Sequence, residues 1–253
     1  MQANLSDKII LITGASGGLG SHFAQTLAQA GAHVVLAARR LATIDALRAD
    51  IETAGGRAST IALDVADPDS IELCVKDINH TVGTINVLIN NAGVTHQAPA
   101  LEMDAAAWER VQAINLRGPM LMARACARRM IDKGVGGSII NISSILGHRV
   151  MGHLTPYIAS KAGLEHLSRA LALEWARYGI RVNCIAPGYI ETPINHAYFQ
   201  TSAGQQTIKR IPQRRLGQAS DLDGVLLLLA SDASSYMTGS TLVVDGGHLQ
   251  SGL

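Results

Sequence analysis

The residues best suited to proton transfer are Tyr157 and Lys161, which lie four positions apart in a segment of helical periodicity. Side chains at this spacing occupy one face of a helix. A phenol has an ordinary pKa near ~10 in water, and we expect the neighbouring ammonium group to lower that pKa. Such a pair is suited to act as a general acid in ketone reduction or as a base in alcohol oxidation. Ser144 precedes Tyr157 by 13 residues, and we expect its hydroxyl to hydrogen-bond the same substrate oxygen.

A glycine-rich turn follows the first apolar segment and leads into a helical segment, in the stretch Thr13-Gly14-Ala15-Ser16-Gly17-Gly18-Leu19-Gly20. Glycines allow a tight turn and let backbone N–H groups approach a pyrophosphate. The helix that follows presents its positive dipole end to the phosphates. The turn therefore predicts a dinucleotide site, and its expected cofactor-binding residues are Gly14, Ser16, Gly18, Leu19 and Gly20.

Two arginines stand where the ribose of the dinucleotide is recognised. Enzymes that use NAD carry a carboxylate about 20 residues after the glycines, whereas this sequence has Ala38, Arg39 and Arg40. A guanidinium group pairs with a 2′-phosphate through charge-assisted hydrogen bonds, although two such arginines are also compatible with a solvated surface patch. Arg39 therefore favours NADP(H), and NAD(H) is the second possibility. Asp64 and Val65, after the third strand, are expected beside the adenine.

Apolar segments of strand length alternate along the chain with longer segments of helical period. The predicted strands are residues 8–13, 33–38, 58–63, 85–89, 138–143, 181–185 and 242–244. The predicted helices are residues 19–30, 41–54, 68–82, 104–132, 157–178 and 219–230. Most strands are continuous runs of Ile, Val and Leu, which is typical of a parallel sheet covered on both faces. We predict one α/β domain over residues 1–253: a doubly wound Rossmann-type fold whose parallel sheet has about seven strands and helices on both faces.

One polar segment, residues 188–217, interrupts this alternation after a predicted strand. In an α/β enzyme, a long insertion at the carboxyl end of a strand is a candidate lid over the substrate. A variable surface loop is the alternative.

Composition narrows the class of protein. The chain has 21 basic and 20 acidic residues and a formal net charge of +1, so it lacks the basic excess that nucleic acids and anionic membranes attract. Hydrophobic residues make up 47%, enough to bury a large core. The separated cysteines Cys74, Cys126 and Cys184 are typical of free thiols in a reducing compartment. With neither a signal peptide nor an apolar segment of membrane-spanning length, we expect a soluble, cytoplasmic protein.

Six motifs, in this order, resemble the short-chain dehydrogenase/reductase family over nearly the whole chain. The turn Thr13–Gly20 resembles its TGxxxGxG motif, Asn90-Asn91-Ala92-Gly93 its NNAG segment, and Asn115-Leu116-Arg117-Gly118 its helix asparagine. Ser144, Tyr157 and Lys161 match its catalytic serine and YxxxK motif. Pro187-Gly188 through Thr192 matches PGxxxT, and Thr238-Gly239 to Asp245-Gly246-Gly247 resembles its last strand.

The resemblance implies a role for each matching residue. Tyr157 would be the acid/base, Ser144 would hold the substrate oxygen, and Lys161 would lower the pKa of the tyrosine and bind the nicotinamide ribose. Asn115 would hold a water molecule in a proton relay behind Lys161. The implied cofactor-binding residues further along the chain are Asn91, Ala92, Gly93, Tyr157, Lys161, Pro187, Gly188, Ile190 and Thr192. The family's NADPH enzymes often carry a basic residue where this turn has Gly17, which leaves Arg39 as the main NADP determinant.

The resemblance also implies an oxidoreductase that interconverts a ketone and a secondary alcohol with NADP(H), as a carbonyl reductase for a ketone or 3-oxoacyl substrate. The alternatives are an NAD-dependent alcohol or sugar-alcohol dehydrogenase and a non-catalytic dinucleotide-binding protein. The expected substrate-binding residues are Ser144, His148, His153, Tyr157 and Tyr189. The two histidines lack a third ligand at metal spacing, so we expect no metal. The wider set of pocket candidates is apolar or neutral and polar, so it does not demand a carboxylate or phosphate: Thr95, His96, His148, His153, Leu154, Tyr189 and Tyr198. The helices near 104–132 and 157–178 resemble those that pair subunits in the family, which implies a homotetramer or homodimer.

Overall fold

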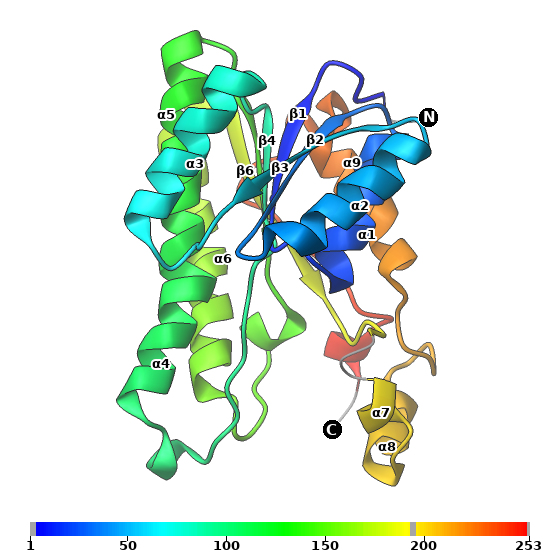
Figure 1. The fold of residues 1–253 in the computed structure, drawn as a ribbon. Helices are drawn as coiled ribbons and strands as arrows, with labels where there is room; N and C mark the ends of the chain where they lie inside the picture. Colours follow the sequence, from blue (N-terminus) through cyan, green and yellow to red (C-terminus); the bar gives the residue numbers. More distant parts are fainter. Residues whose placement is uncertain (1–3, 193–195, 252–253) are drawn as a thin grey trace.

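The computed structural model describes residues 4–192 and 196–251, which form one parallel sheet in the order β3-β2-β1-β4-β5-β6-β7 (Figure 1). The strands are β1 (Ile9–Thr13), β2 (His33–Ala38), β3 (Arg57–Ala62), β4 (Val87–Asn90), β5 (Gly137–Ile142), β6 (Ile180–Pro187) and β7 (Thr241–Val244). The chain winds outward from β1 in both directions, which is the Rossmann arrangement. The predicted doubly wound sheet of seven strands is confirmed, and its strands differ from the predicted ranges by one or two residues at most ends.

Helices cover both faces of this sheet (Figure 1). One face packs against α1 (Gly18–Gln29), α2 (Leu41–Thr53) and α9 (Asp223–Ala230), and the other against α3 (Pro68–Thr81), α5 (Gly118–Lys133) and α6 (Thr155–Trp175). Successive strand residues point to opposite faces. In β1, Ile10 and Ile12 therefore enter the first core and Leu11 the second, which explains why this central strand is a continuous apolar run.

The predicted helix over 104–132 is wrong as a single α-helix. The structure divides it into α4 (Ala105–Gln112), a π-helical segment (Ala113–Arg117) and α5. Pro119 has no N–H to donate to the carbonyl of Asn115 four residues earlier, so the regular α-helical register breaks there. The N–H of Gly118 bonds instead to the carbonyl of Ala113, five residues back. Such π segments occur frequently at functional sites.

The segment 188–217 is more regular than its polar composition indicates. It contains α7 (His196–Phe199) and α8 (Ser202–Arg210), which lie apart from the two helical layers (Figure 1). At its base Ile190 forms a parallel bridge with Gly217, and the N–H of Gly217 donates to the carbonyl of Tyr189 over 2.9 Å. Both ends of the insertion are thereby joined beside the end of β6. Residues 193–195 of the predicted lid lie outside the described residues.

Candidate active site

The predicted catalytic residues meet at the carboxyl edge of the sheet, where doubly wound folds bind their ligands. Ser144 follows β5 by two residues, and Tyr157 and Lys161 lie in the first two turns of α6. Thr155 begins this helix and Pro156 occupies its first turn, a position where the missing N–H of proline costs nothing. The helix thus starts beside the end of β5 and directs both side chains toward it.

Lys161 is buried, with 4% of its surface exposed. Its Nζ donates to the backbone carbonyl of Ile142 over 2.7 Å and lies 5.5 Å from the centroid of the Tyr157 ring. Burial lowers the pKa of Lys161 to about 8, while Cys184 and Glu165 act in the opposite direction. The last residue of β5 therefore fixes the ammonium group under the tyrosine.

The expected lowering of the Tyr157 pKa is not found in this structure. Burial, the largest effect, raises the pKa of the phenol, and a hydrogen bond with Ser144 partly offsets the rise. Removing the phenolate from water disfavours its charge, and the ammonium group of Lys161 directs a hydrogen bond to Ile142. Tyr157 is thus held in the protonated form that a general acid for ketone reduction requires.

Asn115 joins three parts of the site. It is fully buried, and its side chain accepts from the N–H of Val94 and donates to the carbonyl of Val94, both over 2.8 Å. It also donates to Ser160 Oγ over 3.1 Å. A Cβ placed on Gly93 would lie 3.6 Å from Asn115 Oδ1 and 3.7 Å from Lys161 Nζ. The loop after β4, the π segment and α6 therefore meet at Gly93, while the water expected at Asn115 stays a prediction.

The glycine-rich turn is tied to the NNAG segment. The side chain of Asn91 donates to the carbonyls of Thr13 and Gly14, and Thr13 Oγ1 accepts from the N–H groups of Asn91 and Ala92. A Cβ on Gly20 would lie only 2.3 Å from the carbonyl oxygen of Gly14. By contrast, no atom lies within 4 Å of a Cβ placed on the neighbouring Gly17 or Gly18. Open space at the start of α1 and close packing behind it fit a dinucleotide pyrophosphate.

The other predicted cofactor residues surround the same edge. Arg39 and Arg40 are exposed, and neither forms a hydrogen bond or ion pair within residues 4–192 and 196–251. Asp64 Oδ1 accepts from the N–H of Ala66 over 2.9 Å, so this carboxylate is held in place after β3. The remaining ones are placed as follows: Ser16, Leu19 and Val65 are half-buried, Pro187 ends β6, Gly188 donates to Val244, Ile190 bridges Gly217, and Thr192 is half-buried.

The predicted substrate residues do not all come together. His148 Nε2 lies 3.1 Å from Glu165 Oε2, and Ser143 Oγ donates to Glu165 Oε1 over 2.7 Å. Sequence reasoning missed this buried glutamate, although Glu165 continues the Tyr157 and Lys161 face at the same spacing. His153 is exposed and its backbone carbonyl accepts from Ala98.

A cavity of about 1170 Å³ opens next to these residues. Ile145 and Leu146, which follow the catalytic serine, form part of its lining, and Tyr189 is the predicted substrate residue that reaches it. The cavity is also lined by residues that sequence reasoning missed: Arg149, which adjoins the predicted His148, and Arg210, Arg214 and His248 from distant segments.

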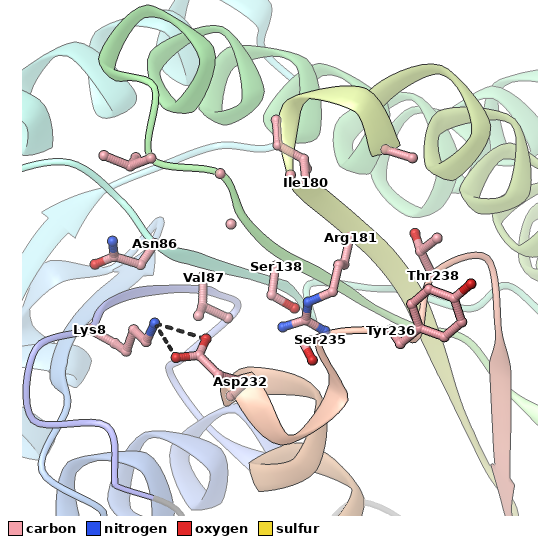
Figure 2. A pocket seen from close by; sticks show the side chains of 16 residues that line it. Lys8, Asn86, Val87, Ser138, Ile180, Arg181, Asp232, Ser235, Tyr236 and Thr238 are labelled. Carbon is pink, nitrogen blue, oxygen red and sulfur yellow. Dashed lines mark hydrogen bonds and ion pairs between the residues drawn. The ribbon is translucent and has the colours of Figure 1, made fainter.

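A second cavity of about 570 Å³ lies at the opposite edge of the sheet (Figure 2). Its lining includes the first residues of β4, β5 and β6, so it is remote from the catalytic residues at the carboxyl ends. Lys8 pairs with Asp232 over 3.1 Å, and Arg181 donates to Ser234 Oγ over 2.7 Å. The positively charged side chains of Lys8 and Arg181 therefore already have partners within the protein.

Two kinds of feature are absent from the described ranges. No group of three or more His, Cys, Asp and Glu residues there has the arrangement of a metal site. None of the helices in those ranges combines the length and apolar character that a membrane crossing requires. Cys74, Cys126 and Cys184 are all free and buried.

Comparison with known proteins assigns the family. A family model described as enoyl-(acyl carrier protein) reductase matches residues 14–248. The chain is 36% identical over 245 residues to gluconate 5-dehydrogenase of Gluconobacter oxydans, covering 96% of this chain and 95% of that one. It is 37% identical over 243 residues to 3-oxoacyl-[acyl-carrier-protein] reductase of Thermotoga maritima, covering 96% and 98%.

A solved structure agrees with these sequence matches. The gluconate 5-dehydrogenase of Burkholderia cenocepacia, in complex with NADP and tartrate, superimposes with a TM-score of 0.94 at 36% identity, over 98% of each chain. The fold, the ordered motifs and these matches define an oxidoreductase of the Rossmann class. The chain belongs to the short-chain dehydrogenase/reductase family.

Proposed function

We propose that this protein is an NADP(H)-dependent carbonyl reductase that interconverts a ketone and a secondary alcohol. The observation that carries the proposal is the arrangement of Ser144, Tyr157 and Lys161, in which a protonated phenol hydrogen-bonds a serine beside a buried ammonium group. A bound nicotinamide supplies or accepts the hydride, and the protein supplies the proton and the orientation.

Each residue then has one task in the reduction. Ser144 donates a hydrogen bond to the carbonyl oxygen of the substrate, and Tyr157 transfers its proton to that oxygen as the alcohol forms. Lys161 lies 5.5 Å from the centroid of the phenol ring, and we propose that in the complex with the cofactor it binds the nicotinamide ribose and, together with the charge of the oxidised nicotinamide, stabilises the phenolate left behind. Asn115 keeps the loop after β4 against α6 and holds the water through which the proton is replaced.

The open turn at Gly17 and Gly18 and the exposed Arg39 support the choice of NADP(H). An N–H-lined helix start binds the pyrophosphate, and Arg39 binds the 2′-phosphate. The Burkholderia relative, whose structure contains NADP, adds support from outside this chain. Within this proposal, Asp64 and Val65 bind the adenine, and Ile190 and Thr192 contact the carboxamide end of the cofactor.

The first experiment measures initial rates with NADPH and NADH against ketones of varied size and charge. We expect NADPH to be preferred, and Arg39→Ala to lower kcat/KM for NADPH about 10-fold or more, because a charge-assisted hydrogen bond contributes ~1.5–3 kcal/mol. Arg40→Ala is the matched control and should change this preference little. Faster turnover of the unmodified enzyme with NADH would favour the alternative, an NAD-dependent alcohol or sugar-alcohol dehydrogenase.

The second experiment tests the acid/base. Tyr157→Phe keeps the ring but removes the proton, so we expect kcat to fall by about 10²–10⁴-fold while NADPH affinity stays within a factor of two or three. Binding is measured by the fluorescence of the bound nicotinamide. Unchanged turnover would refute the mechanism and return weight to a non-catalytic dinucleotide-binding protein.

The same proposal includes an assembly, a location and a lid. Met120 and Ile131 of α5 and Leu173 of α6 leave apolar surface exposed, which supports a homotetramer or homodimer formed through these helices. Sedimentation analysis of the purified chain tests the assembly. The three free, buried thiols support a cytoplasmic location.

The insertion 188–217, joined at its base by the Ile190–Gly217 bridge, is proposed to close over the substrate.

A further inference from the structure

The cavity beside the catalytic edge has charge of one sign only. Its charged side chains are Arg149, Arg210 and Arg214, and no Asp or Glu belongs to the described residues that line it. The three arginines come from the segment after Ser144, from the last turn of α8 and from the chain that follows α8. In the cavity at the opposite edge, by contrast, Asp232 neutralises Lys8.

The three guanidinium groups differ in how they are held. Arg149 is half-buried, and its Nη1 donates to the carbonyl of His248 over 2.7 Å and to Ser251 Oγ over 3.1 Å. Arg214 donates to the carbonyl of Lys209. The guanidinium group of Arg210 is exposed and makes no hydrogen bond or ion pair with any described residue. The cavity therefore combines the guanidinium group of Arg149, which is held in place, with that of Arg210, whose hydrogen-bond donors are all available.

His248, which also lines the cavity, has a ring nitrogen without a hydrogen-bond partner among the described residues. This nitrogen, Nδ1, is buried. Burial lowers the pKa of this imidazole, and the charges of Arg149 and Arg210 lower it further, against the opposing effect of Asp245. The carboxylate of Asp245 accepts from the N–H groups of Gly247 and Leu249 and is not among the residues that line the cavity.

The position of the cavity links this charge to the reaction. Ile145 and Leu146 line it and directly follow Ser144, the residue proposed above to hold the reacting oxygen. Tyr189 also lines it, with its ring 5.5 Å from that of His248. A molecule whose reacting carbon lies at Ser144 therefore extends along Tyr189 toward the arginines.

We propose that the substrate is anionic: a hydroxy or keto compound whose terminal oxyanion, a carboxylate or a phosphate, is bound by Arg149 and Arg210. Arginine forks suit either group because they donate two parallel hydrogen bonds. This inference rests on the proposed function, because it places the reacting carbon at Ser144 and Tyr157. It differs from the expectation that the pocket residues demand no anion, which did not include Arg149, Arg210 or Arg214.

The test compares probes that share a carbon chain and differ in charge. D-gluconate, D-glucitol and D-glucitol 6-phosphate are titrated calorimetrically into the NADP⁺-saturated full chain. We expect one of the anions to bind at least 10-fold more tightly than glucitol, and raised salt to weaken only anion binding. The preferred anion identifies the oxyanion. Equal or tighter binding of glucitol would overturn the proposal.

Two variants on α8 sharpen the result. Arg210→Ala should weaken binding of the preferred anion about 10-fold and leave glucitol binding unchanged. Lys209→Ala is the matched control, because it removes a neighbouring charge that does not line the cavity. Equal losses in both variants would mean that only the general field of the protein attracts the anion, which also overturns the site. Arg149→Gln should weaken anion binding as well, and its melting temperature shows whether the contacts to His248 and Ser251 survive.

The failures of the two proposals are distinguishable. Calorimetry is repeated on Tyr157→Phe, which lacks the proposed acid but keeps the cavity. Arginine-dependent anion binding by this variant would stand even if no ketone or alcohol were turned over. Turnover of neutral substrates without anion preference would sustain the oxidoreductase and refute the anionic substrate.

Discussion

Substitutions at two glycines of the same turn, Gly17 and Gly20, should have different effects. One should lower the stability of the fold, and the other should weaken nucleotide binding. A Cβ on Gly20 would lie 2.3 Å from the carbonyl oxygen of Gly14 and 2.6 Å from Asn91 Nδ2. Nothing lies within 4 Å of a Cβ on Gly17, whose backbone is extended and which caps α1. We therefore expect Gly20→Ala to lower the stability of the protein and Gly17→Ser to weaken only nucleotide binding.

The expected magnitudes follow from these contacts. Overpacking costs ~1–3 kcal/mol, and contact with a backbone atom at 2.3 Å places Gly20→Ala at the upper end. Alanine recovers about 1 kcal/mol through its helix propensity, which leaves a loss of about 2 kcal/mol. For a domain of this size, each kcal/mol lowers the melting temperature by roughly 2–4 °C, so we expect a decrease of about 4–8 °C. Gly17→Ser should change it by less than about 2 °C, because serine is a preferred N-cap residue.

The assay uses protein without nucleotide, unfolded by heat and by urea, followed by NADPH titration of the folded variants. We expect Gly17→Ser to keep its stability and lose NADPH affinity about 10-fold, because the serine occupies space proposed for the pyrophosphate. The opposite pattern would refute the geometry: Gly20→Ala as stable as the unmodified protein, or both variants destabilised equally.

Two further predictions concern buried titratable groups. Burial lowers the pKa of Lys161 from 10.5 to about 8, so between these values the unfolded chain binds more protons and stability rises with pH. Relative to Lys161→Met, the free energy of unfolding of the unmodified protein should rise by up to about 3 kcal/mol between pH 7 and pH 10.5; a difference independent of pH would contradict this. Burial raises the pKa of all three cysteine thiols, to about 12 for Cys74 and about 11 for Cys184. Ellman's reagent should therefore label none of them in the native protein at pH 8 and all of them after unfolding, and rapid native labelling would show that a thiol is accessible.

Much of the fold was predictable because its strands lie between two helical layers. A strand buried on both faces is mostly apolar on both, and runs such as Ile9–Thr13 show this without any tertiary information. The π segment was not predictable in the same way. The helical period continues through residues 104–132, and the break becomes evident only when Pro119 is considered with the bonds that Asn115 makes to Val94 in another part of the chain.

The proposed catalytic residues were easier to predict from the sequence than the residues proposed to bind the anion, and the reason is again physical. Tyr157 and Lys161 are placed by helix geometry alone, so a spacing of four was enough to pair them. Glu165 has the same spacing, but its burial depends on Gly147, where a Cβ would lie 2.6 Å from Glu165 Oε1. Local sequence does not indicate that contact.

The proposed anion site depends on long-range folding to a greater degree still. Arg149, Arg210 and His248 are far apart in a chain of net charge +1, and overall charge says nothing about where positive charge gathers. Their meeting requires the turn after β5, the insertion and the C-terminal segment to be folded together. Because Arg210 belongs to the insertion, substitutions there should change which compound binds while leaving the proton transfer at Tyr157 intact. A fold organised in this way can change its substrate without rebuilding its catalytic centre.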